Sequence, residues 1–319
     1  MHSGMVGNAV KEALLQESLG EGEALSSFAT DTYETNIPHE RLDTMNEPTV
    51  AIMLPTYREA QNIERLIREI QSLSLNSVVL VVDDSSSDGT ADIVRRLQRE
   101  YDNTILLVRP AKLGLGTAIT AGFRLLLSLE KPPDYIIAMD SDYSHNPKDI
   151  PRLIGSAKQG NDLVIGSRYS HGGKTEGWPF ERQLISHIAN LIATVMVGVR
   201  AQDCTSGFRC YSIDYVRSVI NDLHSQTYEI QIETVKQARN RKFRISEVPI
   251  VFSNRKRGKS KLTKAEFRDF LAYVIKSKFG VEILSEENST ELKNSFSEAR
   301  GVDEGIERLI NLYRRIRFF

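Results

Sequence analysis

The sequence predicts an α/β protein whose doubly wound, mostly parallel sheet is flanked by helices. Strand-like and helix-like segments alternate four times between residues 50 and 142, at a spacing of roughly 30 residues, which is typical of parallel βαβ units. The strand-like segments are nearly continuous runs of Val, Ile and Leu, as expected for strands covered on both faces. Three of them end in polar residues rich in acids, which indicates a ligand site at the carboxyl edge of the sheet.

Each strand of this sheet is an apolar run bounded by polar or turn-forming residues. We expect strands at 50–57, 77–85, 104–110, 134–142 and 162–169, and a late one at 243–254 that contains a proline. Helices are expected between the first four strands, at 62–73, 91–101 and 117–129. The first of these repeats apolar residues at Ile63, Leu66, Ile67 and Ile70, which is the spacing of one helical face.

Composition and charge divide the 319 residues into three parts. Residues 1–47 form an acidic extension, 48–261 the α/β domain, and 262–319 a tail with the pattern of basic amphipathic helices. With 41 basic and 42 acidic residues the net charge is −1, so no overall positive field attracts nucleic acid. The chain has only 2 cysteines, Cys204 and Cys210, too few for a disulfide framework, which favours a reducing compartment.

No segment predicts a membrane span. The most apolar stretch, Leu184–Val199, is short for a bilayer and contains His187 and Asn190, so we expect a buried or interfacial helix there. The start of the chain lacks the pattern of a secretory signal. Together with the basic tail, these features predict a cytoplasmic protein that attaches peripherally to the membrane surface.

The polar strand ends carry the candidate chemistry. Asp140-Ser141-Asp142 offers hard carboxylate oxygens, the ligands that Mg²⁺ or Mn²⁺ prefers when it also binds substrate phosphates. The acidic run that begins at Asp83-Asp84 fits a turn with a helix cap, or the phospho-acceptor pocket of a receiver domain, although no matching lysine-bearing strand follows it. Leu113–Gly116 lacks the full dinucleotide-binding glycine pattern, and a tight turn with close backbone approach explains it.

Eight blocks of residues, taken in order, resemble the dolichol-phosphate mannose synthases, which are family 2 glycosyltransferases of GT-A fold. The early blocks are shared by many family 2 enzymes, whereas the later ones are more specific for polyprenyl-phosphate acceptors. The similarity covers roughly residues 48–265, and its blocks are LPTYREAQNI, VVDDSSSDGT, KLGLGTAITAGF, MDSDYSHNP, VIGSRY, WPFERQLISHIAN, DCTSGFRCY and FSNRKRGKSKL.

The resemblance implies a role for individual residues. The positions that match the nucleotide pocket are Pro55, Tyr57, Glu59, Val82 and Asp84, and those that match the metal and diphosphate site are Asp140, Ser141 and Asp142. On the acceptor side, Arg168 matches an arginine near the transferred sugar and the acceptor phosphate, and Arg182 and Ser186 match contacts to that phosphate. Arg255 and Lys261 match bases on a loop that closes over the donor diphosphate, and Ser144 stands where some relatives have a glutamine metal ligand.

The reaction that the resemblance implies is the inverting transfer of a hexose, first of all mannose from GDP-mannose, to a polyprenyl or dolichyl phosphate. Mg²⁺ or Mn²⁺ and basic residues would stabilise the leaving diphosphate, and guanidinium groups would hold the acceptor phosphate. That phosphate ionises with a second pKa of about 6, so no general base is required. Expected partners besides the two substrates are the membrane surface and a small membrane-anchoring subunit or a second copy of the chain.

Two alternatives remain open at this point. The donor could be UDP-glucose or a UDP-amino sugar, because the motifs do not specify the base or the sugar. The protein could instead be a catalytically silent nucleotide-sugar-binding protein, although its intact acidic and basic residues argue against this.

Overall fold

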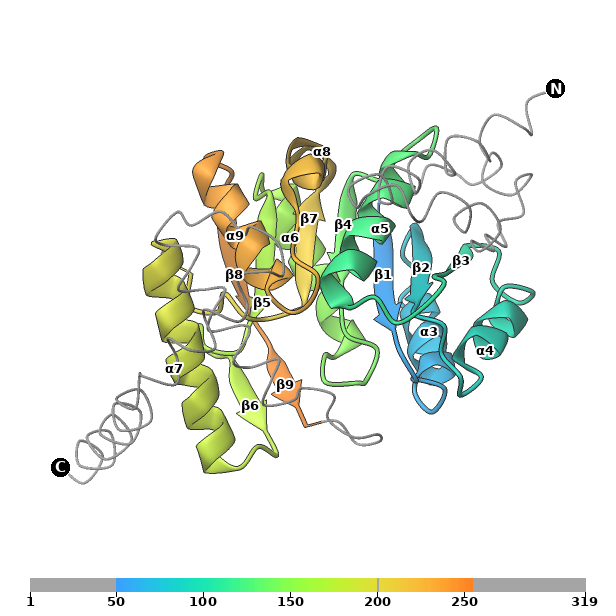
Figure 1. The fold of residues 1–319 in the computed structure, drawn as a ribbon, viewed down its shortest axis with the longest axis horizontal. Helices are drawn as coiled ribbons and strands as arrows, with labels where there is room; N and C mark the ends of the chain where they lie inside the picture. Colours follow the sequence, from blue (N-terminus) through green and yellow to red (C-terminus); the bar gives the residue numbers. More distant parts are fainter. Residues whose placement is uncertain (1–49, 200, 255–319) are drawn as a thin grey trace, which may run out of the picture. The chain divides into compact units, whose positions relative to one another are not determined.

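The computed structural model describes residues 50–199 and 201–254, which are the coloured part of Figure 1. The predicted acidic extension 1–47, the helical tail 262–319, and the segment with Arg255 and Lys261 lie outside the described residues. The described part belongs to one compact unit, Met1–Lys278.

A seven-stranded sheet forms the centre of the described part, in the order β3-β2-β1-β4-β7-β5-β8. All neighbouring pairs are parallel except the two that involve β7, so the sheet is mostly parallel, as predicted. The strands are β1 Val50–Thr56, β2 Ser77–Asp83, β3 Thr104–Val108, β4 Tyr135–Ala138, β5 Leu163–Ser167, β7 Arg209–Ser212 and β8 Ile245–Pro249.

Helices cover both faces of the sheet, and each face has its own hydrophobic cluster. One cluster contains residues of α3 Ile63–Gln71, α4 Thr90–Leu97 and α6 Ile150–Lys158, and the other contains residues of α5 Leu115–Leu127, α7 Phe180–Val197, α8 Ile213–Val219 and α9 Ile230–Asn240. Every residue of β2 is buried, which explains why its sequence is a run of valine and leucine without alternation. Burial of a side chain of this size stabilises the fold by about 1.5–3 kcal/mol.

The order of the strands reverses between β1 and β4. β2 and β3 follow β1 on one side, whereas β4 pairs with β1 on the other, with Val50 opposite Tyr135. In open α/β sheets the crevice at such a switch point, beyond the carboxyl ends of the strands, is where ligands bind. The chain therefore brings the ends of β1, β2 and β4 to one place.

Two features of the second half differ from the sequence-based prediction. The late strand predicted at 243–254 is two strands, because β8 joins the main sheet while β9 Val251–Ser253 pairs with β6 Lys174–Glu176 in a separate two-stranded sheet. The antiparallel strand β7 was not predicted, because its four residues RCYS show neither a long apolar run nor a clear alternation. Two short 3₁₀ turns, Pro147–Asp149 and Ile220–Asp222, complete the described elements.

Helix α7 contains most of the apolar stretch predicted as a buried or interfacial helix. Ala189, Ala193 and Val197 lie in the core, and Leu191 is 63% exposed, so the helix has a buried face and an apolar residue on the surface. Within the described ranges, no helix combines the length and the hydropathy that crossing a membrane requires.

Candidate active site

A pocket of about 340 Å³ opens at the switch point between β1 and β4. Its volume is at the lower end of the range for small-molecule sites. Seven of the residues proposed from the sequence line it together: Pro55, Tyr57, Glu59, Asp84, Asp140, Ser141 and Asp142. They come from the ends of three strands that are up to 87 residues apart in the chain, and only the parallel sheet brings them together.

Asp84 forms one wall of the pocket and is held by a buried arginine. Arg109 donates from Nε to Asp84 Oδ1 at 2.6 Å, and the backbone N–H groups of Leu113 and Gly114 donate to Asp84 Oδ2 at 3.1 Å each. Arg109 also donates to Thr117 Oγ1 at 2.7 Å. The carboxylate therefore fixes the glycine-rich turn against the pocket. Since both of its oxygens are engaged, this arrangement does not favour the phospho-acceptor hypothesis.

The glycine-rich turn packs against a second loop of the protein, and this loop occupies the place that a phosphate group would take. The N–H of Gly116 donates to the carbonyl oxygen of Gln226 at 2.9 Å, so the start of α5 is occupied by protein. A Cβ on Gly116 would lie 2.1 Å from the carbonyl oxygen of Ser225. This close approach places Thr227 and Tyr228 in the lining of the pocket. The sequence predicted the tight turn but gave no signal for the loop that fills it.

Asp140 and Asp142 lie in the turn that follows β4. The side chain of Asp140 is 38% exposed, whereas Asp142 is buried and accepts a hydrogen bond from the N–H of Ser144 at 3.0 Å. Nδ1 of His145 accepts from the N–H of Asp140 at 3.2 Å, while the ring stacks on Phe208 with centroids 5.0 Å apart. His145 is therefore a structural hydrogen-bonding partner of this turn.

The donor set of this turn fits a divalent cation that is shared with substrate phosphate. Asp140 and Asp142 supply hard carboxylate oxygens at the pocket, and the buried Oγ of Ser144 has no hydrogen-bond partner among the described residues. In the part of the chain that the structure describes, no group of three or more His, Cys, Asp and Glu side chains is placed to hold a metal ion. A site with two carboxylates suits Mg²⁺ or Mn²⁺, which complete their coordination with water and phosphate oxygens.

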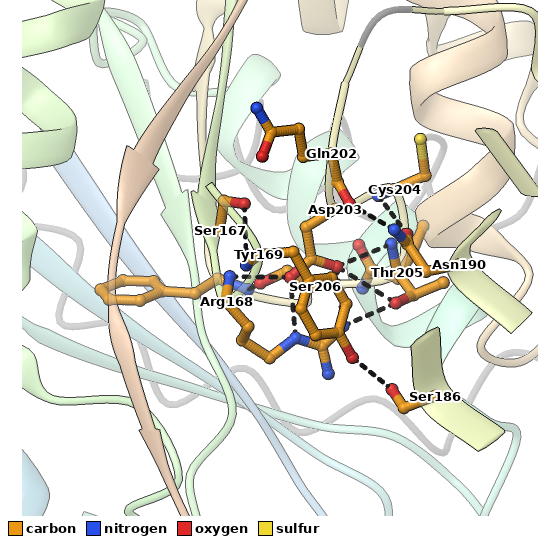
Figure 2. A network of polar contacts seen from close by, with 12 residues as sticks. Ser167, Arg168, Tyr169, Ser186, Asn190, Gln202, Asp203, Cys204, Thr205 and Ser206 are labelled. Atoms are coloured by element: carbon orange, nitrogen blue, oxygen red, sulfur yellow. Dashed lines mark hydrogen bonds and ion pairs between the residues drawn. The ribbon is translucent and has the colours of Figure 1, made fainter. Parts of the chain in front are cut away.

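Arg168, at the end of β5, is held rigidly by Asp203 (Figure 2). Its Nε donates to Asp203 Oδ2 and its Nη2 to Asp203 Oδ1, both at 2.7 Å, and Nη2 also donates to Thr205 Oγ1 at 2.6 Å. Both partners are buried. Burial alone would lower the pKa of Arg168, but the charge of Asp203 and its hydrogen bonds raise this pKa above its ordinary value. The guanidinium is thus a permanent cation in a fixed orientation.

Two residues from other elements hold the loop that carries Asp203. Glu247 on β8 accepts from the N–H groups of Gln202 and Asp203 at 2.8 and 2.9 Å. From the other side, Asn190 on α7 accepts from the N–H of Cys204 at 2.8 Å and donates to the carbonyl of Gln202 (Figure 2). The position of Arg168 is therefore set by a loop that is fixed between β8 and α7.

Arg209, in the sequence block DCTSGFRCY, has a structural function. It is fully buried and donates to the carbonyl oxygens of Cys204, Ser206 and Gln231, each at 2.7 Å. A buried guanidinium without a carboxylate partner is stable only when such acceptors surround it. Arg209 holds the 203–207 loop through the carbonyl oxygens of Cys204 and Ser206. The same loop lies close to the acidic turn, because a Cβ on Gly207 would lie 3.3 Å from Oδ1 of Asp140. The loop thus connects Arg168 with the acidic turn.

The other predicted residues are distributed as follows. Val82 does not line the pocket, because its side chain is fully buried in the core against α5. Ser186 lies on α7 beside Tyr169, and the side chain of Arg182 on the same helix lies outside the described part. The structure adds Lys112, which lines the pocket with its Nζ 5.0 Å from the centroid of the Tyr57 ring. The sequence shows a lysine next to the glycine-rich turn, but it does not indicate that this side chain faces the pocket.

Comparison with known proteins agrees with this architecture. Residues 51–220 match the family model described as glycosyl transferase family 2. The chain is 39% identical over 216 residues to an undecaprenyl-phosphate mannosyltransferase of Micrococcus luteus, covering 67% of this chain and 87% of that protein. It is 34% identical over 220 residues to a polyprenol monophosphomannose synthase of Mycolicibacterium smegmatis, covering 68% and 82%.

Solved structures with the same fold include glucosyl-3-phosphoglycerate synthase from Mycobacterium tuberculosis. Its complex with phosphoglyceric acid has a TM-score of 0.55 at 18% identity, covering 76% of this chain and 82% of that one. Its complex with Mn²⁺, UDP-glucose and phosphoglyceric acid has a TM-score of 0.54 at 19% identity, covering 76% and 82%. At this level of identity the similarity shows the fold, and it confirms the predicted GT-A architecture.

The chain belongs to glycosyl transferase family 2. It is a glycosyltransferase, and the resemblance noted in its sequence blocks is confirmed by relatives that act on polyprenyl phosphates.

Proposed function

We propose that this glycosyltransferase transfers mannose from GDP-mannose to a polyprenyl phosphate and inverts the anomeric centre. The observation that carries the proposal is that one short loop, residues 203–207, connects an acidic turn at the pocket with a rigid buried arginine. Transfer to a lipid phosphate needs this combination, because one phosphate group leaves while another attacks the same carbon. Both named relatives, whose lengths the chain covers by more than four fifths, are polyprenyl-phosphate mannosyl enzymes by name.

The donor nucleotide is assigned to the pocket between β1 and β4. Tyr57 and Glu59 offer an aromatic face and an acceptor for a base and ribose, Asp84 holds the pocket wall in place, and Lys112 adds a positive charge. A divalent cation, Mg²⁺ or Mn²⁺, held by Asp140 and Asp142 would neutralise charge on the leaving diphosphate. The predicted roles of Arg255 and Lys261, which would close over that diphosphate, stay proposals of the same kind.

The acceptor phosphate is assigned to Arg168, with Ser186 and Arg182 on α7. A guanidinium that is already oriented loses little freedom when it binds phosphate, and its charge offsets the repulsion between the two phosphate groups. An ionised phosphate oxygen is itself a sufficient nucleophile, since its second pKa is about 6. Direct attack opposite the leaving diphosphate inverts the anomeric carbon, so an α-linked donor gives a β-linked lipid product.

A screen of donors and acceptors tests this proposal. Purified protein is incubated with Mn²⁺, a short polyprenyl phosphate and one of GDP-mannose, UDP-glucose or a UDP-amino sugar, and the lipid product is identified by mass. We expect hexosyl-phosphate lipid with GDP-mannose. A product only with a UDP sugar would correct the donor, and no product with any donor would refute the enzymatic proposal. The variant Asp142→Asn serves as the inactive control.

A further inference from the structure

Tyr169 connects the buried arginine with helix α7. It follows Arg168 directly at the end of β5, and its Oη donates a hydrogen bond to Oγ of Ser186 at 2.7 Å (Figure 2). Its ring lies against the ring of His187, with centroids 4.1 Å apart, and the Cζ of Arg168 lies 5.0 Å from the centroid of the same ring. One side chain therefore contacts Arg168, Ser186 and His187, although the last two are 17 or more residues away in the chain.

The direction of the hydrogen bond determines what the serine can do. Because Tyr169 donates, the Ser186 oxygen uses a lone pair for this contact and keeps its own proton. Among the described residues, Ser186 donates no hydrogen bond. Its hydroxyl proton is therefore available for an anion, and the fixed oxygen limits the directions in which it can point.

The guanidinium of Arg168 is likewise only partly used. Nε and Nη2 are taken up by Asp203 and Thr205, and within the described part of the chain Nη1 donates no hydrogen bond. The ring of Tyr169 lies beside this guanidinium, and the side chain extends from there toward α7 (Figure 2). A fixed cation and an available hydroxyl, bridged by one aromatic side chain, form a preorganised pair of donors for a phosphate.

We propose that Tyr169 is a positioning residue that orients the Ser186 hydroxyl toward the acceptor phosphate beside Arg168. This inference rests on the proposed function, since it presumes that Ser186 and Arg168 contact that phosphate. It assigns to Tyr169 an effect on binding of the lipid phosphate alone. The donor pocket is lined by other residues and does not include Tyr169.

Replacement of the hydroxyl separates this role from simple packing. Tyr169→Phe keeps the ring, and with it the contacts to Arg168 and His187, and removes only the hydrogen bond to Ser186. We expect the KM for polyprenyl phosphate to rise roughly 5- to 10-fold, while kcat and the KM for the nucleotide sugar stay within about 2-fold. Tyr101→Phe is the matched control, because Tyr101 is also half-buried and also loses one side-chain hydrogen bond, but far from the site.

A double-mutant cycle tests whether Tyr169 acts through Ser186. Ser186→Ala should raise the acceptor KM by roughly 10-fold or more, and adding Tyr169→Phe to it should change this KM by less than about 2-fold. Additive effects, an unchanged acceptor KM in Tyr169→Phe, or equal changes in both KM values would each overturn the inference. If the unmodified protein transfers no sugar to polyprenyl phosphate, the proposed function fails instead, and this is seen before any variant is compared.

Discussion

Arg168 and Asp203 form a bidentate ion pair in which the carboxylate is fully buried and the guanidinium nearly so. Such a pair contributes little net stability, because desolvation of the two charges cancels most of their attraction. The pair instead fixes the geometry, because it holds the Arg168 side chain, and with it a permanent positive charge, in one position beside α7. The pair also makes the site sensitive to loss of either partner.

Asp203→Asn should destabilise the protein by about 3 kcal/mol at neutral pH, because it leaves the charge of Arg168 buried without a counter-ion. Burial favours the neutral acid, but Arg168 and its hydrogen bonds hold the pKa of the Asp203 carboxyl below its usual value. The contribution of this depressed pKa is present above the unfolded pKa of about 3.9 and is lost as the pH falls through the folded value.

Urea unfolding at about pH 7 and about pH 3 measures both effects. The gap in unfolding free energy between the unmodified protein and Asp203→Asn should be largest at neutral pH and narrow in acid. Asp214→Asn is the control, because Asp214 pairs with Arg217 on the surface, where such a pair is worth about 0–1 kcal/mol. A gap that does not change with pH would contradict the expected titration of Asp203.

Gly116→Ala should displace the loop at 224–228 from the start of α5. Its Cβ would lie 2.1 Å from the Ser225 carbonyl oxygen, so the backbone must move, at a cost of about 1–3 kcal/mol. Because Thr227 and Tyr228 line the pocket, we also expect a higher KM for the nucleotide sugar. Gly155→Ala on α6 is the matched control: its Cβ meets nothing within 4 Å, so the variant should gain up to about 1 kcal/mol. Thermal unfolding and donor kinetics compare the two variants, and equal stabilities would contradict the close approach.

The fold was predictable because short stretches of the sequence carry the pattern of each strand and helix. The unbroken apolar runs of β1 and β2 indicate strands covered on both sides, and the polar residues that follow them locate the carboxyl edge. The pocket residues at 55–59 and 140–142 follow from this rule alone. Val82 is implied by the family resemblance and not by this rule, and its side chain faces the core.

The contacts that join distant segments were not predictable. Asp203 is 35 residues from Arg168, and no spacing rule connects a strand end with a loop beyond a long helix. The contact between Gln226 and Gly116 joins residues more than a hundred positions apart in the chain. The need for glycine at position 116 is explained only by the backbone carbonyl groups that approach it. The resemblance to a family implies a role for Arg168, but only the three-dimensional structure shows that Asp203, Glu247 and Asn190 hold it in place.

Both cysteines of the chain should be unreactive in the native protein. Cys204 and Cys210 are fully buried, and burial raises the pKa of both thiols, so the reactive thiolate is scarce as well as inaccessible. We expect a thiol reagent at neutral pH to label neither residue until denaturant unfolds the protein, when both react. Rapid labelling of one thiol without denaturant, located by mass of the peptides, would show that the 203–207 loop or β7 opens in the native state.

Removal of divalent metal should strongly slow transfer. The acidic turn contributes two carboxylates to the pocket, so without a bound cation these described residues offer no positive charge to the leaving diphosphate. A chelator should reduce the rate by about 10²-fold or more, and Mn²⁺ or Mg²⁺ should restore it. Asp142→Asn should reproduce the loss and resist rescue, whereas Asp134→Asn, exposed at the opposite end of β4, should keep the normal rate. Thermal unfolding gives an independent readout, because Mn²⁺ together with GDP should raise the Tm of the unmodified protein and not that of Asp142→Asn. Full activity in the chelator would mean that protein cations alone stabilise the leaving group, and Lys112 would then be the first residue to replace.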